Sequence, residues 1–241
     1  MNGNRLRLVS ATIFVLLVAA TLCAQQTAEE YLKRGKELLA KKEYLQARES
    51  FERAVELAPA SAEAYYFRGQ VQLDDQKAVA DYTKAIELKP DYAEAYFQRG
   101  LQMDLSNQRA AALQNYNKAL ELNPNFLDAL RSRAVLYLLD KKNKLALADY
   151  TKIIELKPDG ESYYMRGNSY LEIGDPTKAI VDLTRSIQLD PTYYWTYKQR
   201  AKAYRQTNKL RLRSGRAEGS SHRSAILATG TCEARPFPAS D

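Results

Sequence analysis

The chain has 241 residues, a formal net charge of +7, one His and two Cys. His222, Cys23 and Cys232 all lie near the ends, so residues 25–193 offer no His or Cys for a Ser-His triad, a thiolate nucleophile or a zinc site. A Gly-rich phosphate-binding loop is also missing from the sequence. We therefore predict that the protein is not an enzyme, with no catalytic residues, no metal, no cofactor and no small-molecule substrate.

The positive charge is concentrated at the two ends of the chain. Residues 25–193 hold 24 Lys or Arg and 26 Asp or Glu, whereas residues 194–241 hold ten Lys or Arg and three acids. A sequence pI near 9.2 is typical of proteins that bind nucleic acid or anionic membranes, but the acidic body offers no such basic surface. We predict no nucleic-acid partner for the body of the chain.

The first predicted element covers residues 1–24. Arg5 and Arg7 precede an uncharged apolar run from Leu8 to Ala24, which is the order of regions in a secretory signal peptide. Cleavage after Ala24 or after Ala20 would suit this pattern. The alternative is an uncleaved N-terminal anchor, although the run is slightly short for a membrane span. Either interpretation predicts an exported protein, periplasmic or secreted if cleaved, and in contact with a membrane only if the segment is kept.

Five repeats follow, each ending near a proline. The prolines Pro59, Pro90, Pro124, Pro158 and Pro191 are 31, 34, 34 and 33 residues apart, and such a period indicates a repeat architecture. With the proline as position 32 of its unit, the predicted repeats cover 28–61, 62–92, 93–126, 127–159 and 160–193. The second repeat is three residues short around Leu73–Gln76, so we expect a tighter turn there and no break in the array.

The chain ends in a partial sixth repeat and a different kind of tail. Residues 194–207 continue the pattern with Tyr197, Ala201 and Tyr204 and are predicted to form a capping helix. Position 20 of this unit would be Arg213, which cannot serve as a small packing residue. Residues 208–241 show no helical period, and we predict a disordered tail. A sharper hypothesis is that this tail is an out-of-frame translation that replaces a lost second helix.

The repeats share columns of large and small residues. Position 4 is aromatic or Leu, at Tyr31, Tyr65, Tyr96, Leu130, Tyr163 and Tyr197. Position 8 is small, at Gly35, Gly69, Gly100, Ala134, Gly167 and Ala201. Position 20 is always Ala, and position 24 is Phe51, Tyr82, Tyr116, Tyr150 or Leu183. Spacings of three, four and seven residues place these columns on one helical face, so two helices per repeat can approach closely.

This pattern resembles that of the tetratricopeptide repeat (TPR) family over residues 28 to about 205. The resemblance implies an all-α, right-handed superhelical solenoid of helix-turn-helix units. It also implies a scaffold that binds other proteins through a concave groove, which is lined by positions 2, 5, 9 and 12 of the first helices.

A further column carries arginine in all six units, at position 7. Position 23 of the second helix carries Asp81, Asn115, Asp149 and Asp182, with Ser50 in the first repeat. We expect the arginine stem to lie on the core and its guanidinium to pair with the residue at position 23. The alternative hypothesis is a ladder that binds an anionic partner.

The groove candidates come from the columns that the resemblance places inside the concave face. They are Tyr66, Phe97, Leu101, Arg131, Val135, Tyr164, Asn168 and Lys198. Position 2 adds an acidic row, which Trp195 interrupts, so the groove suits a segment with apolar and basic side chains. The predicted function is a scaffold or adaptor that binds a peptide segment of another protein. The alternative is a structural or self-associating module of a cell-envelope complex without a peptide ligand.

Overall fold

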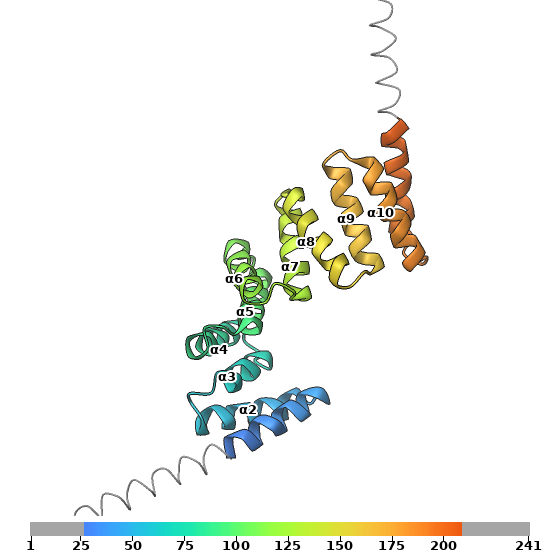
Figure 1. Ribbon diagram of the computed structural model, residues 1–241. Helices are drawn as coiled ribbons and strands as arrows, with labels where there is room; N and C mark the ends of the chain where they lie inside the picture. Colours follow the sequence, from blue (N-terminus) through green and yellow to red (C-terminus); the bar gives the residue numbers. More distant parts are fainter. Residues whose placement is uncertain (1–26, 209–241) are drawn as a thin grey trace, which may run out of the picture. The chain divides into compact units, whose positions relative to one another are not determined.

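The computed structural model describes residues 27–208, which are drawn as coloured ribbons in Figure 1. The predicted signal segment 1–24 and the predicted tail, apart from its first residue, lie outside the described residues. The chain divides after Leu139 into two compact units, so residues 27–139 and residues 140–208 are described separately.

Both units consist of helices joined by short turns. The first unit begins with a helix over 27–40 and continues with α2 (Tyr44–Leu57), α3 (Ala62–Gln70), α4 (Asp75–Leu88), α5 (Ala93–Leu105), α6 (Arg109–Leu122) and α7 (Leu127–Leu139). The second unit contains α8 (Asn143–Leu156), α9 (Gly160–Glu172), α10 (Pro176–Leu189) and a helix over 194–208. Because no strand occurs within residues 27–208, the predicted all-α fold is confirmed.

Successive helices pack against one another within each unit. From α2 to α7 every helix contacts the next one, and in the second unit α8 contacts α9 and α9 contacts α10. The shortened second repeat follows this rule, since α3 touches both α2 and α4. The array is not broken, as expected, but the expected tighter turn is wrong: the deletion shortens the first helix, since α3 has 9 residues where α5 has 13. Four residues separate α3 from α4, and three separate α5 from α6.

The repeat prolines end the second helices. The residue before each proline is extended, with ψ between 74° and 92°, at Ala58, Lys89, Asn123, Lys157 and Asp190. Proline disfavours helical geometry in the residue before it and cannot donate a backbone hydrogen bond. These prolines therefore stop the second helices.

The small and large columns meet as predicted. A methyl group added to Gly100 would lie 2.8 Å from Cε1 of Tyr116, and one added to Gly69 would lie 2.8 Å from Cε1 of Tyr82. Such distances are too short for a real side chain, so the aromatic ring at position 24 rests on the bare backbone of position 8. This close approach forms the core of these helix pairs. An isolated helix of this length is only marginally stable in water, so each helix depends on this packing.

A backbone feature of the turns was not predicted. The turn within a repeat contains a left-handed residue at Lys42, Asn107, Lys141 and Gly174, with φ between 58° and 82°. All four occupy position 15 of their repeats. The turn of the shortened second repeat has no such residue among the described positions.

Candidate functional site

The structure places the predicted groove residues at very different depths. Tyr66 and Phe97 are buried, with 9% and 6% of their surface exposed. Leu101, Arg131, Tyr164 and Asn168 are half-buried, while Val135 and Lys198 are exposed. The three aromatic candidates therefore offer little surface to a ligand.

The reason is a second aromatic column that sequence reasoning missed. Each aromatic at position 5 contacts an aromatic at position 34, just before the next repeat begins. The ring centroids are 4.8 Å apart for Tyr66 and Tyr92, 4.9 Å for Phe97 and Phe126, and 5.0 Å for Tyr164 and Tyr193. Such pairs add about 0.5–1.5 kcal/mol beyond simple burial. These aromatic pairs join one repeat to the next, and their first function is structural.

Burial also changes the acid–base properties of one such pair. It raises the pKa of the Tyr66 hydroxyl above its ordinary value, and the nearby Glu94 carboxylate adds to this shift. The pKa of Tyr92 is raised as well, mainly by burial and then by its neighbour Tyr66. Both hydroxyls are therefore neutral at physiological pH, and Tyr66 accepts a hydrogen bond from Gln70 Nε2 at 2.9 Å.

The junction between the first two repeats lacks this pair. Position 5 is Leu32 and position 34 is Ser61, and a hollow of about 150 Å³ lies between them. Its walls are Ala28, Glu29, Leu32, Ala54, Ala58, Ser61, Glu63 and Ala64. The Ser61 hydroxyl is occupied, because it accepts the backbone N–H of Ala64 at 3.2 Å and so caps α3. The hollow thus combines an apolar floor with room for about one side chain.

The rim of the hollow is acidic. Glu29 and Glu63 both belong to the acidic row at position 2, and both are exposed. Glu63 forms an ion pair with Lys36, whose ammonium group also lies 4.8 Å from the centre of the Phe67 ring. With one carboxylate paired, the rim keeps a net negative charge and favours a cationic neighbour.

Family models for tetratricopeptide repeats match this chain along most of the described residues. One matches residues 32–81 and 106–161, a second matches 74–103, and a third matches 160–193. The chain belongs to the tetratricopeptide repeat family. The family assignment made from the repeat columns is confirmed.

Solved structures of other TPR proteins resemble this TPR chain in fold. YrrB, described as a TPR protein with an unusual peptide-binding site, is 22% identical with a TM-score of 0.60 and covers 70% of this chain and 89% of its own. MamA from Desulfovibrio magneticus RS-1 is 18% identical with a TM-score of 0.61, covering 69% and 97%. A TPR protein from Parabacteroides merdae is 21% identical with a TM-score of 0.62, covering 88% and 81%. No curated protein matches the chain. At these identities the likeness shows a shared fold.

The arginine column of this TPR chain is part of the repeat packing. Arg68 donates to both oxygens of Asp81 at 3.0 and 2.5 Å, and Arg166 donates to those of Asp182 at 2.7 and 2.8 Å. Arg99 donates to Asn115 Oδ1 at 2.9 Å. The predicted pairing with position 23 is confirmed in these three repeats, which argues against an anion-binding ladder there.

The same arginines reach back to the preceding repeat, which sequence reasoning missed. Arg99, Arg166 and Arg200 each donate to a threonine hydroxyl at position 25, and Arg133 donates to the Asn117 amide oxygen at the same position. Each guanidinium also lies 5.2–5.8 Å from a tyrosine ring of its own helix, at Tyr65, Tyr96, Tyr137, Tyr163 and Tyr197. The arginine column therefore provides contacts between neighbouring repeats.

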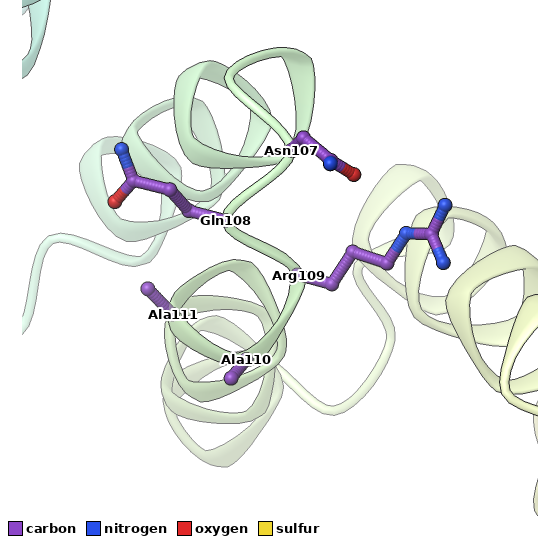
Figure 2. A pocket seen from close by; sticks show the side chains of 5 residues that line it. All are labelled: Asn107, Gln108, Arg109, Ala110 and Ala111. Carbon is purple, nitrogen blue, oxygen red and sulfur yellow. The ribbon is translucent and has the colours of Figure 1, made fainter.

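Two other hollows lie at turns of the first unit. One of about 360 Å³ is bounded by the start of α4 and the last turn of α5, including Val79, Gln102 and Met103. The other, of about 600 Å³, is lined by the consecutive residues Asn107–Ala111 (Figure 2). In Figure 2 the Asn107 and Arg109 side chains extend on one side of the turn and Gln108 on the other.

The described residues contain no group of His, Cys, Asp and Glu that could hold a metal ion. Within 27–208, no helix is both long enough and apolar enough to cross a membrane. TPR proteins are generally scaffolds that bind other proteins rather than enzymes.

Proposed function

We propose that this TPR chain is a non-enzymatic scaffold that binds a peptide segment of another protein along the first helices of residues 27–139. The observation that carries the proposal is the hollow beside Leu32 and Ser61, where an aromatic pair is missing. An apolar side chain of the peptide enters this hollow and takes the place that the two rings occupy in the later repeats. Burying such a side chain contributes about 1.5–3 kcal/mol.

The charges near the hollow specify the rest of the peptide. Glu29 and Glu63 stand at its rim, and the acidic row continues with Glu94 and Asp128 on α5 and α7. A Lys or Arg close to the apolar anchor therefore gains electrostatic attraction and a faster encounter. Recognition of peptides is supported by analogy with YrrB, which its structure describes as having a peptide-binding site.

The test is selection of a random peptide library on the full chain and on a variant with the hollow filled. Leu32→Phe with Ser61→Tyr restores the missing aromatic pair, while Leu45→Phe adds the same ring at an exposed position of α2. We expect the native chain and the Leu45→Phe control to select peptides with an apolar residue next to Lys or Arg, and the filled variant to lose them. Thermal unfolding of all three proteins establishes that each one is folded.

A second comparison isolates the charge. Glu29→Gln should weaken the preference for a basic residue. Glu30→Gln, at an exposed neighbour that does not line the hollow, should not. If the filled variant selects the same peptides with the same affinity, the hollow is not the binding site. If no peptide is selected and the native chain sediments as an oligomer, the self-associating alternative is correct.

We also propose that the scaffold is exported. The support is the order of Arg5, Arg7 and the apolar run from Leu8 to Ala24. N-terminal sequencing of the protein purified from its native cells tests this: a first residue at 21 or 25 establishes cleavage and export. An intact Met1 on protein recovered from the cytosol would refute it.

A further inference from the structure

In the first, second, third and fifth repeats the second helix covers the first helix of the same repeat. The contact is centred on the small residue at position 8, which is buried at Gly35, Gly69, Gly100 and Gly167. The ring or Leu of position 24 rests on it, as Leu183 does on Gly167, where an added methyl group would lie 2.9 Å from Leu183 Cγ. We call this covered face of a first helix the second-helix seat.

The helix over 194–208 has the same seat without a described second helix. Its seat consists of Tyr197, Ala201 and Tyr204 at positions 4, 8 and 11, with Arg200 at position 7. Ala201 is exposed, unlike every other residue at position 8, and Tyr197 and Tyr204 are 40% and 51% exposed. The opposite side of this helix is packed normally, since Ala203 is buried in one cluster with Leu171, Ala179 and Leu183. The helix is thus anchored on one side and presents an apolar surface on the other.

Arg200 shows what is missing from this seat. In the complete repeats, Arg68 and Arg166 each meet an Asp of their own second helix. Arg200 keeps the other two contacts of the column, to Thr184 Oγ1 at 3.5 Å and to the Tyr197 ring at 5.8 Å. Among residues 27–208, no carboxylate pairs with it. Its position therefore suits an incoming Asp or Glu.

The complete repeats specify the chemistry of an occupant. In three of the five, the second helix places an Ala three residues before an Asp, and a large apolar residue directly after it. This arrangement occurs at Ala78, Asp81 and Tyr82 and again at Ala179, Asp182 and Leu183. We propose that the seat on 194–208 binds an amphipathic helix of another protein that carries this Ala-x-x-Asp-Leu or Ala-x-x-Asp-Tyr pattern. The carboxylate pairs with Arg200 and the large side chain covers Ala201 between Tyr197 and Tyr204.

Charge and sequence favour an external partner over this chain itself. The helix over 194–208 carries Lys198, Arg200, Lys202 and Arg205 and no acid, so two copies of it repel each other. Residues 209–241 contain six Lys or Arg and three acids. None of those acids fits the pattern, because Glu218 is followed by Gly219 and Glu233 by Ala234, and Pro238 rather than an Ala stands three residues before Asp241. The tail therefore lacks the pattern that the seat requires.

The experiment uses a peptide of the α4 sequence, Asp75–Leu88, as the probe. A covalent staple between residues 76 and 80, both exposed in α4, holds the peptide helical. The free-energy cost of folding a short helix then does not mask binding. Binding to the full chain is followed by the anisotropy of a dye on the peptide. Trp195, the single Trp of the chain, reports from the same helix.

We expect the stapled peptide to bind, and Ala201→Leu to abolish binding by filling the place of the incoming ring. An Asp81→Asn version of the peptide should bind about tenfold more weakly to the native chain, because a charge-assisted hydrogen bond is lost. The two peptides should bind equally to an Arg200→Gln variant. Arg205→Gln removes the same charge from an exposed position of the same helix and should change the affinity less than about twofold.

Three outcomes would overturn the proposal. One is that the stapled peptide does not bind the folded full chain. Another is that binding is insensitive to Ala201→Leu or to the exchange of Asp for Asn. The third is a native chain that sediments as a dimer and becomes monomeric with Ala201→Leu, which would identify the occupant as a second copy.

Discussion

Two neighbouring junctions of the first unit differ at positions 5 and 34 of the repeat. After the second repeat, Tyr66 and Tyr92 lie in contact and fill the space between the helices. After the first repeat, Leu32 and Ser61 occupy the same positions and leave a hollow of about 150 Å³. Both junctions join a second helix to the next first helix, and we attribute the difference between them to these side chains. An aromatic residue at position 5 is therefore packed against a ring at position 34, whereas a small residue at position 34 leaves a hollow.

The arginine column offers the same contrast between a complete and an incomplete pair. Arg68 faces the Asp81 carboxylate, whereas Arg99 in the next repeat faces the neutral amide of Asn115. The pKa of Arg68 is raised, mainly by its hydrogen bond to Asp81. Burial instead lowers the pKa of the Arg99 guanidinium. One repeat therefore compensates its buried charge, and the other relies on dipoles and a tyrosine ring.

The largest effect should come from opening a complete junction. Phe97→Ala removes a ring that contacts both Tyr116 and Phe126, and truncation of a buried aromatic residue costs about 3–5 kcal/mol. Leu32→Ala, at the junction that is already open, should cost less than half as much. Urea unfolding of both variants gives the two free energies of unfolding. Equal losses would show that the two junctions do not differ in the way proposed.

The helix faces were predictable from the sequence, but these junctions were not. Positions 4, 8, 20 and 24 lie on regular helices, where spacings of three, four and seven residues identify a shared face. Tyr92 and Phe126 lie in turns between repeats, where no period applies, and their partners Tyr66 and Phe97 are 26 and 29 residues away in sequence. The hydrogen bonds that Thr83 and Thr151 accept from Arg99 and Arg166 were not predicted, because a threonine hydroxyl on a second helix could equally well face solvent. A search for covariation between positions 5 and 34 of the repeats could have found the aromatic pair.

The next largest effect should follow from breaking a complete arginine pair. Asp81→Ala leaves the guanidinium of Arg68, which is mostly buried, without its carboxylate, and we expect a loss of about 2–3 kcal/mol in the free energy of unfolding. Asp75→Ala, at the exposed start of the same helix, is the control and should change stability by less than about 1 kcal/mol. Chemical denaturation measures both. A loss at Asp81 no greater than at Asp75 would mean that the pair contributes only a surface interaction.

A smaller gain should come from completing the incomplete pair. Asn115→Asp gives Arg99 a carboxylate at the position where Arg68 has one, and we expect about 1 kcal/mol of stabilisation at neutral pH. The substitution sacrifices the hydrogen bond from Asn115 Nδ2 to the Ala111 carbonyl, which limits the gain. Pairing lowers the pKa of the new carboxyl below its unfolded value of about 3.9. The added stability is therefore present above that pH and is lost as the pH falls through the lower, folded pKa.

Thermal unfolding of the Asn115→Asp variant at neutral and acidic pH tests this sign. A variant that is destabilised at neutral pH, or whose difference from the native protein does not change on acidification, would show that Arg99 is already satisfied. In that case the Asn115 amide satisfies Arg99 as well as a carboxylate would, and the Asn–Asp difference between the two repeats has no effect on stability.

The smallest effect at neutral pH concerns the ring at position 24, which is Tyr116 in the third repeat and Phe51 in the first. Both rings are fully buried on the small residue of position 8. Because the first repeat packs well without the hydroxyl, Tyr116→Phe should change the free energy of unfolding by less than about 1 kcal/mol at pH 7. At high pH the two proteins should diverge. Burial raises the pKa of Tyr116 to about 12 from an ordinary value of 10.0, so the folded state favours the protonated form.

The native protein therefore keeps its full stability below pH 10 and loses roughly 2–3 kcal/mol through this group as the pH rises toward 12. Tyr116→Phe removes that loss, whereas the exposed Tyr44→Phe serves as a control that should not. Urea midpoints measured across this alkaline range for the three proteins give the comparison. If the Tyr116→Phe variant weakens as steeply as the native chain, other buried tyrosines dominate the alkaline transition. In that case the hydroxyl of Tyr116 would have no measurable effect on the free energy of unfolding at any pH.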